Sequence, residues 1–363
     1  MGIFGFGKKK NECIISSDSP LANMTAQVIV ENNCSYLYLS QTNTAGEGPA
    51  ASIIASCWIK NHVNVPDTYS PDSDMKRGLQ PKIPTMYCGF QEDLSPFKAN
   101  QLEIVWGKEG VIAYLYDSGE LICVIPYWAN QDFNGYSKYS STDRFPTIPF
   151  PLGNPESNTL FKRAEEARDF WKQDFSLLWG SYQDAYLSEL EGKYGKHVKY
   201  YAIDGGNFPP KALVTFEKDD LKYAFTVGVG LFPQPNADMY FQDYQVYECI
   251  ELGFCYQVNY AFDETAVLSQ ISSIAAIPWE CNVCLGHRHT TNLQVDTMHD
   301  FAVMISDMDV RVAESQFLKE RNVNLLWLMP IGKEVYKKLI AEPPDYSYVD
   351  ARIAKSDIVL RGL

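Results

Sequence analysis

Two cysteines and two histidines stand close together in the second half of the chain and suggest metal chemistry. Cys281 and Cys284 form a Cys-x-x-Cys pair, and His287 and His289 follow directly. Two thiolates and two imidazoles are ligands that a tetrahedral zinc ion prefers. Structural zinc sites normally join two pairs that are separated in the chain, so ligands packed into one short segment strain the geometry. The alternative is two buried thiols beside a loop whose histidines bond to backbone carbonyls.

The same segment offers a thiol nucleophile and an imidazole base, because imidazole can draw the proton from a thiol. Neighbours on one short segment seldom reach the geometry that this reaction needs. The sequence contains no Gly-x-Ser-x-Gly elbow and no P-loop, and Gly228-Val-Gly230 lacks the third glycine of a dinucleotide-binding loop. We therefore expect a protein that is not an enzyme and that uses no cofactor. The alternative is a zinc-stabilised domain or a metal-dependent enzyme that uses these two cysteines and two histidines.

Aromatic residues make up 13% of the chain, with 7 tryptophans and 23 tyrosines. Most of them belong in hydrophobic cores, but Tyr and Trp also anchor protein interfaces because they combine a large apolar area with a polar tip. An antiparallel edge strand could add backbone pairing to an extended partner segment. The side chains that we expect at a partner interface are Trp128, Phe232, Tyr240, Trp279, His287 and His289.

The first half of the chain is predicted to be mostly β-structure. Its strand-like runs are joined by connections too short for a parallel crossover, which predicts an antiparallel meander. Between these runs, proline-rich and aspartate-rich stretches lose all periodicity. We place a β-rich domain over residues 1–155. The predicted strands are a hairpin over 25–40 and runs at 52–59, 102–106, 110–116 and 120–128.

The second half, residues 156–363, is predicted to mix helices and strands, which makes the chain α+β with two domains. Residues 159–180 show the clearest helical periodicity, with a cap at Asn158 or Thr159 and a stop at Gly180. A second helix is predicted over 182–194. Further helices are expected at 264–275 and 333–341, and strands at 198–203, 212–216, 223–229, 245–254 and 324–328.

Four segments occur in an order and spacing that resemble the suppressor-of-fused family. They read FTVGVGLFPQP at 225–235, ECIELGF at 248–254, IPWECNVCLGHRHT at 277–290 and NVNLLWLMPIGKEVYKKL at 322–339. The series is similar to a Thr-x-Gly strand, an Ile/Val-Glu-Leu strand, a Gly-His loop and an apolar strand ending in Pro-Ile. Residues 102–128 also resemble the N-terminal region of bacterial members.

The resemblance implies a non-enzymatic module that binds another protein, and bacterial relatives include immunity proteins that neutralise toxins. It implies a mixed α/β domain in the C-terminal half. Structural roles are expected at the positions that match the family motifs. These positions are Thr226, Gly228, Glu251, Gly286 and His287.

The charge of the chain narrows the range of partners. A net charge of −14 disfavours binding to a phosphate backbone, so we expect no nucleic acid. The same charge suits a basic protein such as a toxin.

No stretch reaches the 18 or so apolar residues of a membrane span, and residues 1–10 lack the order of a secretory signal. Nine cysteines without a disulfide-type spacing favour the cytoplasm. The oligomeric state stays open.

Overall fold

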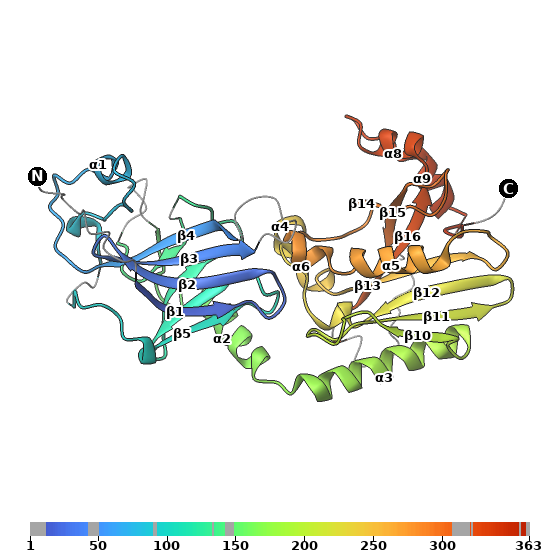
Figure 1. The fold of residues 1–363 in the computed structure, drawn as a ribbon, viewed down its shortest axis with the longest axis horizontal. Coiled ribbons are helices and arrows are strands. Elements are labelled where there is room, and N and C mark those ends of the chain that lie inside the picture. Colours follow the sequence, from blue (N-terminus) through green and yellow to red (C-terminus); the bar gives the residue numbers. More distant parts are fainter. Residues whose placement is uncertain are drawn as a thin grey trace, which may run out of the picture. The chain divides into compact units, whose positions relative to one another are not determined.

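The computed structural model describes residues 12–42, 51–89, 93–132, 134–141, 149–306, 320, 322–355 and 357–360. The chain divides into two compact units, residues 1–172 and residues 173–363, which are treated separately below (Figure 1). Helices and mostly antiparallel sheets occur together, which confirms the α+β class. Within the described ranges, no helix combines the length and the apolar character that crossing a membrane requires.

The first unit contains two mainly antiparallel sheets. One sheet has the strand order β1-β2-β3-β4, and the other has the order β5-β6-β7-β8-β9 with a parallel β8–β9 pair. Two helices accompany them. The elements are β1 Glu12–Asp18, β2 Met24–Glu31, β3 Cys34–Thr42, β4 Ala51–Asn61, α1 Pro71–Met75, β5 Leu102–Trp106, β6 Ala113–Asp117, β7 Glu120–Ile125, β8 Tyr136–Ser137, β9 Phe150–Pro151 and α2 Leu160–Trp171.

Turns in this unit form at residues that tolerate a left-handed backbone. Asn32 and Asn33, with φ of 48° and 61°, join β2 to β3. Ser118 and Gly119, with φ of 51° and 85°, join β6 to β7. Two central residues with positive φ give a turn whose twist matches that of a hairpin. The predicted hairpin and meander are confirmed by this pairing.

Helix α2 packs against β5 and β7 of the first unit. Ala164 and Ala167 are buried, and the Trp171 indole Nε1 donates a hydrogen bond to the Trp106 carbonyl at 2.8 Å. These contacts place α2 in the first compact unit, which ends at Lys172. The sequence assigns the same segment to the second domain, and its domain boundary after residue 155 stays a prediction.

The second unit is built on one sheet of seven strands. Its order is β10-β11-β12-β13-β16-β15-β14, in which only the β13–β16 pair is parallel. Helix α3 lies along β11 and β12 (Figure 1). The elements are α3 Phe175–Tyr194, β10 Lys199–Ala202, β11 Ala212–Lys218, β12 Leu221–Val227, α4 Ala237–Tyr240, β13 Ile250–Gln257, α5 Glu264–Ile274, α6 Ile277–Cys281, β14 Thr290–Asn292, β15 Phe301–Ser306, β16 Asn324–Ile331, α8 Lys333–Leu339 and α9 Ser347–Ile353.

The prediction of one helix over 159–180 is wrong, because the chain forms two helices there. α2 ends at Trp171, and the Asp174 carboxylate accepts two backbone N–H groups of the next helix and caps its start. Gly180 therefore lies inside α3 and does not stop it. The helix ends instead at Gly195, whose φ of 87° suits glycine.

Most other elements of the second unit match their predictions, with shifted ends. The strand expected from residue 245 begins at Ile250, because Tyr244–Val246 form a 3₁₀ turn. No local pattern predicted α4, α6, β14, β15 or α9. The missed β15 pairs with β16 and so completes the wall of the pocket described next.

Candidate binding site

A pocket of about 420 Å³ lies where the parallel strands β13 and β16 begin. We call it the β13–β16 pocket. Its wall is largely apolar, and three polar residues interrupt it: His287, Ser306 and Asn324. This volume is near the lower end of the roughly 300–1,000 Å³ typical of ligand pockets. The apolar lining residues are Phe241, Val246, Tyr247, Ile250, Leu285, Leu325 and Leu326.

His287 lies at this pocket, next to Gly286, and its imidazole is arranged as an acceptor. The Ser306 backbone N–H donates to His287 Nδ1 at 3.2 Å, which leaves the proton of the neutral ring on Nε2. Burial and the nearby Arg288 guanidinium lower the pKa of His287, although Asp350 acts in the opposite direction. A neutral ring that carries its proton on Nε2 is suited to binding an acceptor.

His289 has a similar local role. Its Nδ1 accepts the backbone N–H of Gly286 at 3.2 Å, and burial lowers the pKa of the ring. The edge of the ring meets Tyr240, with centroids 6.5 Å apart and a near-perpendicular angle of 77°. Tyr240 is 60% exposed and its neighbour Met239 is 55% exposed, so an apolar surface continues outward from the loop.

Two aromatic residues that the sequence analysis did not select also belong to the site. Phe241 and Tyr247 both line the β13–β16 pocket, and their rings stack with centroids 4.5 Å apart. No periodic pattern marks them, because they lie in the irregular segment between α4 and β13. Their proximity in sequence to Tyr240 was the available signal.

Three of the expected partner-binding residues do not lie at this site. Phe232 and Trp279 are only 1% and 3% exposed, so both belong to the core and cannot anchor a partner in this structure. Phe232 packs among Phe175 and Phe208, with centroids 5.6 Å and 5.4 Å away. Trp128 belongs to the first unit, where it is partly exposed.

The cysteine-histidine segment does not assemble a metal site. Cys281 is exposed at the end of α6, whereas Cys284 is buried, and burial with the charge of Asp238 raises the pKa of Cys284 to about 12. Among the described residues, no group of three or more His, Cys, Asp or Glu side chains could hold a metal ion. His287 and His289 use Nδ1 for backbone N–H groups instead. The four-ligand zinc alternative gains no support from this arrangement.

Beneath the pocket, the carboxylate of Glu251 joins three elements of the second unit. Glu251 is completely buried, and it accepts hydrogen bonds from the Tyr182 hydroxyl at 2.6 Å and the Thr226 hydroxyl at 2.5 Å. The backbone N–H groups of Gly228 and Gly230 donate to it at 2.7 and 3.0 Å. Burial raises the pKa of Glu251, and these four donors counteract the rise. We call these five residues the Glu251 cluster.

Gly228 in this cluster has no room for a side chain. Its φ is 104°, and an added Cβ would lie 2.5 Å from the Trp179 ring and 2.7 Å from the Pro210 carbonyl oxygen. The Thr226 hydroxyl also accepts the Leu252 backbone N–H at 2.7 Å, so it links β12 to β13 twice. This geometry fits the structural role expected for these motif positions.

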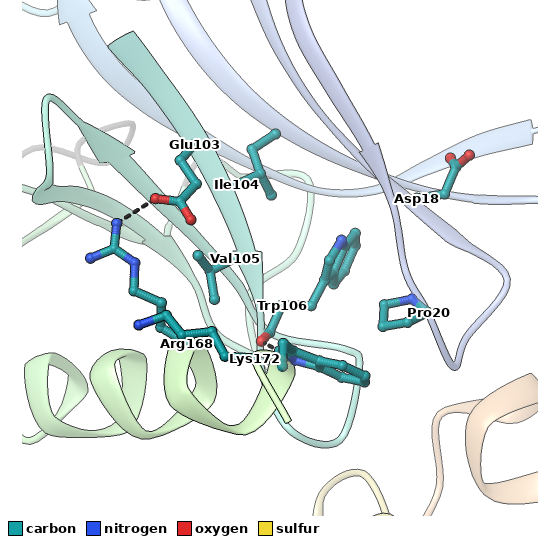
Figure 2. A pocket seen from close by; sticks show the side chains of 9 residues that line it. Asp18, Pro20, Glu103, Ile104, Val105, Trp106, Arg168 and Lys172 are labelled. Atoms are coloured by element: carbon teal, nitrogen blue, oxygen red, sulfur yellow. Dashed lines mark hydrogen bonds and ion pairs between the residues drawn. The ribbon is translucent and has the colours of Figure 1, made fainter. Parts of the chain in front are cut away.

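A second pocket, of about 400 Å³, lies in the first unit. Figure 2 shows Ile104, Val105 and Trp106 of β5 beside it, Pro20 across from Trp106, and Arg168 on α2. Its lining comes from segments that are distant in the sequence, so no local pattern predicts it.

Charged groups around this second pocket already have partners. Arg168 forms an ion pair with Glu103 and lies 4.0 Å from the centre of the Tyr116 ring. Lys172 is paired with Asp169 at 3.0 Å. Asp18, which also lines the pocket, accepts a hydrogen bond from the Thr25 hydroxyl at 2.7 Å. The other lining residues, Pro20, Ile104, Val105, Trp106 and Trp171, are mainly apolar.

Ser35 and His62 of the first unit have the distances of a nucleophile and a base. Ser35 Oγ lies 2.7 Å from His62 Nε2, and His62 Nδ1 lies 3.0 Å from the Leu94 carbonyl oxygen. Ser35 is completely buried, however, and burial lowers the pKa of His62. A nucleophile must reach its substrate, so this pair serves to connect β3 to the segment after β4.

Comparison of the chain with models of protein families, with curated proteins and with solved structures gives no match.

Proposed function

We propose that this chain is a non-enzymatic protein-binding protein whose second unit is a suppressor-of-fused-type module, and that it acts as an immunity protein. In this proposal it sequesters a basic toxin in the cytoplasm. Nucleic acid and membranes are not its partners.

One observation carries the proposal: the β13–β16 pocket opens beside an exposed apolar surface. Met239 and Tyr240 lie next to Phe241, which lines the pocket, and large exposed apolar groups beside a pocket are characteristic of interfaces. Gly286 and His287, from the motif that resembles the family, lie at the same place.

The chemistry of the site also supports binding. His287 and His289 each accept a backbone N–H, so neither is positioned to activate the Cys284 thiol. The high pKa of Cys284 keeps that thiol protonated at neutral pH.

The proposal is tested by co-expressing the chain with the products of the genes adjacent to its own and measuring cell growth. Protection from a toxic product is expected, together with a stoichiometric complex on size-exclusion chromatography. A Tyr240→Ala, Met239→Ala double variant should protect less, because it removes exposed area from the proposed interface and leaves the core intact. A chain that protects against none of these products and forms no complex with them would overturn the proposal.

A further inference from the structure

The pocket of about 400 Å³ in the first unit has an apolar wall built from three separate segments. These segments are β5, α2 and the turn between β1 and β2, and we call the cavity the β5–α2 pocket (Figure 2). Its volume lies within the range of ligand pockets. The apolar residues of the wall are Pro20, Ile104, Val105, Trp106 and Trp171.

The two cations that line this pocket are already held by carboxylates of the chain. Arg168 forms an ion pair with Glu103, and its guanidinium lies 3.6 Å from a Glu165 oxygen. Lys172 pairs with Asp169 at 3.0 Å. These pairs compensate both positive charges of the lining, and they engage Glu103 as well.

Asp18 is the remaining charged group of the lining, and its printed partner is neutral. It is exposed at the end of β1, opposite Thr25 of β2, and its Oδ1 accepts the Thr25 hydroxyl at 2.7 Å. Within the part of the chain that the structure describes, no cation pairs with Asp18. A carboxylate can accept about four hydrogen bonds, so one hydroxyl leaves most of its capacity unused.

An apolar wall beside such a carboxylate suits a side chain that is apolar along its length and cationic at its end. Arg and Lys both place their methylene groups on apolar surface and keep the charged head in water. Arg fits this pocket better, because its planar guanidinium binds a carboxylate through two parallel N–H groups and also stacks on aromatic rings. Trp171, which is half-buried, supplies an aromatic ring in the wall.

We infer that the β5–α2 pocket binds an arginine side chain of a basic protein partner, with the methylene groups against the apolar wall and the guanidinium beside Asp18. The site is a contact of the first unit, additional to the surface of the second unit in the proposed function. The inference rests on the proposed function for the source of the arginine, whereas the binding of arginine itself is measured without the partner.

The test is saturation-transfer difference NMR on the full-length chain at physiological ionic strength, which screens contacts between distant exposed charges. The probe is N-acetyl-arginine methylamide. Its matched neutral counterpart is N-acetyl-citrulline methylamide, which has nearly the same shape and carries no charge. Titration of each probe gives its Kd.

One pair of variants tests the carboxylate. Asp18→Asn removes the charge and keeps an acceptor for the Thr25 hydroxyl. Asp132→Asn is the matched control, because Asp132 is also exposed but lies near the other edge of the first sheet. It follows Gln131, whose carbonyl accepts the hydroxyl of Ser56 on the edge strand β4, whereas Asp18 lies on the edge strand β1.

A second pair of variants tests the apolar wall. Ile104→Lys places a long cationic side chain of the chain itself in the pocket, where it competes with the probe for Asp18. Ile53→Lys makes the same change on β4, where Ile53 is 43% exposed. Circular dichroism reports whether each variant is folded. If Ile104→Lys does not fold, the comparison of Asp18→Asn with its control decides alone.

The arginine probe is expected to bind with a Kd of about 1 mM or tighter, and the citrulline probe about fivefold more weakly or worse. Asp18→Asn should weaken binding of the arginine probe about threefold or more, while Asp132→Asn changes it less than about 1.5-fold. Folded Ile104→Lys should likewise weaken it about threefold or more, and Ile53→Lys less than about 1.5-fold.

No saturation transfer to the arginine probe, equal affinity for the two probes, equal binding by the Asp18→Asn and Asp132→Asn variants, or undiminished binding by a folded Ile104→Lys variant would each overturn the inference. If such a result came with protection against a toxin, the proposed function would stand without this site. If the arginine probe bound as expected but no toxin was neutralised, the arginine site would stand and the proposed function would fall.

Discussion

The Glu251 cluster allows the energetic cost of one substitution to be worked from the structure. Replacing Glu251 by Met keeps a side chain of similar length but removes the acceptor of four hydrogen bonds. The hydroxyls of Tyr182 and Thr226 can rotate to seek other acceptors. The backbone N–H groups of Gly228 and Gly230 cannot, because the turn after β12 fixes them.

A buried donor without an acceptor costs about 1–3 kcal/mol. The two fixed N–H groups alone therefore predict that Glu251→Met lowers the free energy of unfolding of the second unit by about 2–6 kcal/mol. A typical domain has only about 5–15 kcal/mol in total. The loss is thus large enough to leave part of the protein unfolded at 37 °C.

Stability is measured by urea unfolding, followed by hydrogen exchange and mass spectrometry. Peptides that cover β12 and β13 report on the unfolding of the second unit alone. Two variants calibrate it. Tyr182→Phe removes one of the four donors and should cost about 1 kcal/mol. Glu217→Met, which replaces an exposed carboxylate, should change stability by less than about 0.5 kcal/mol.

The reasoning is refuted if Glu251→Met costs less than about 1 kcal/mol while Tyr182→Phe costs as much or more. That result would mean that the two N–H groups find other acceptors or water, and that the carboxylate does not hold the turn.

Three further predictions concern other parts of the chain. Ellman's reagent should rapidly modify Cys13 and Cys281, which are the two exposed thiols among the nine cysteines. The buried Cys284 thiol should react only when the protein unfolds. Fast modification of five or more thiols would contradict this prediction. Burial lowers the pKa of His289 below its ordinary value of about 6.5. The stability that the neutral ring provides is therefore present above pH 6.5 and is lost as the pH falls through the lowered pKa. Amide exchange of residues 284–290, corrected for its intrinsic pH dependence, should therefore accelerate between pH 7 and pH 5. His289→Asn, which keeps an acceptor near the Nδ1 position, should reduce the change, and His287, whose pKa is also lowered, contributes the remainder. Trp171→Phe deletes the indole N–H that bonds to the Trp106 carbonyl and should destabilise the first unit by about 1 kcal/mol in urea unfolding, whereas no loss would show that this hydrogen bond does not stabilise the packing of α2.

The sequence predicted those elements whose local signals are strong. In the first unit, strand-like runs stand on both sides of the Asn32-Asn33 turn and of the Ser118-Gly119 turn. Residues that accept positive φ predicted the positions of these turns, and the runs beside them predicted the strands. The helix break before α3 was missed, since apolar periodicity runs through residues 159–180 and conceals the capping by Asp174. Local hydrogen bonding outweighed the periodic pattern there.

The binding site was predicted only in part, for a different physical reason. Gly286, His287 and Tyr240 were selected, but composition gave no means of separating an exposed aromatic residue from a buried one. Phe232 and Trp279 are core residues, since Phe232 packs with Phe175 of α3 and Phe208, and Lys211 lies over the Trp279 ring; such contacts between distant segments depend on tertiary packing. The pocket wall itself required β13 to meet β16, a pairing that no local pattern encodes.

The pairing of β13 with β16 also constrains the order in which the second unit folds during synthesis. β10 to β13 join through antiparallel pairs between consecutive strands, whereas β13 must wait for β16, in which Asn324 pairs with Ile250. Contacts between distant segments form slowly, and a chain emerging from the ribosome presents its N-terminal elements first. The apolar edge of β13 is thus exposed during synthesis until β16 arrives. The β13–β16 pocket is among the last features to be completed, so a prematurely terminated chain cannot bind a partner there.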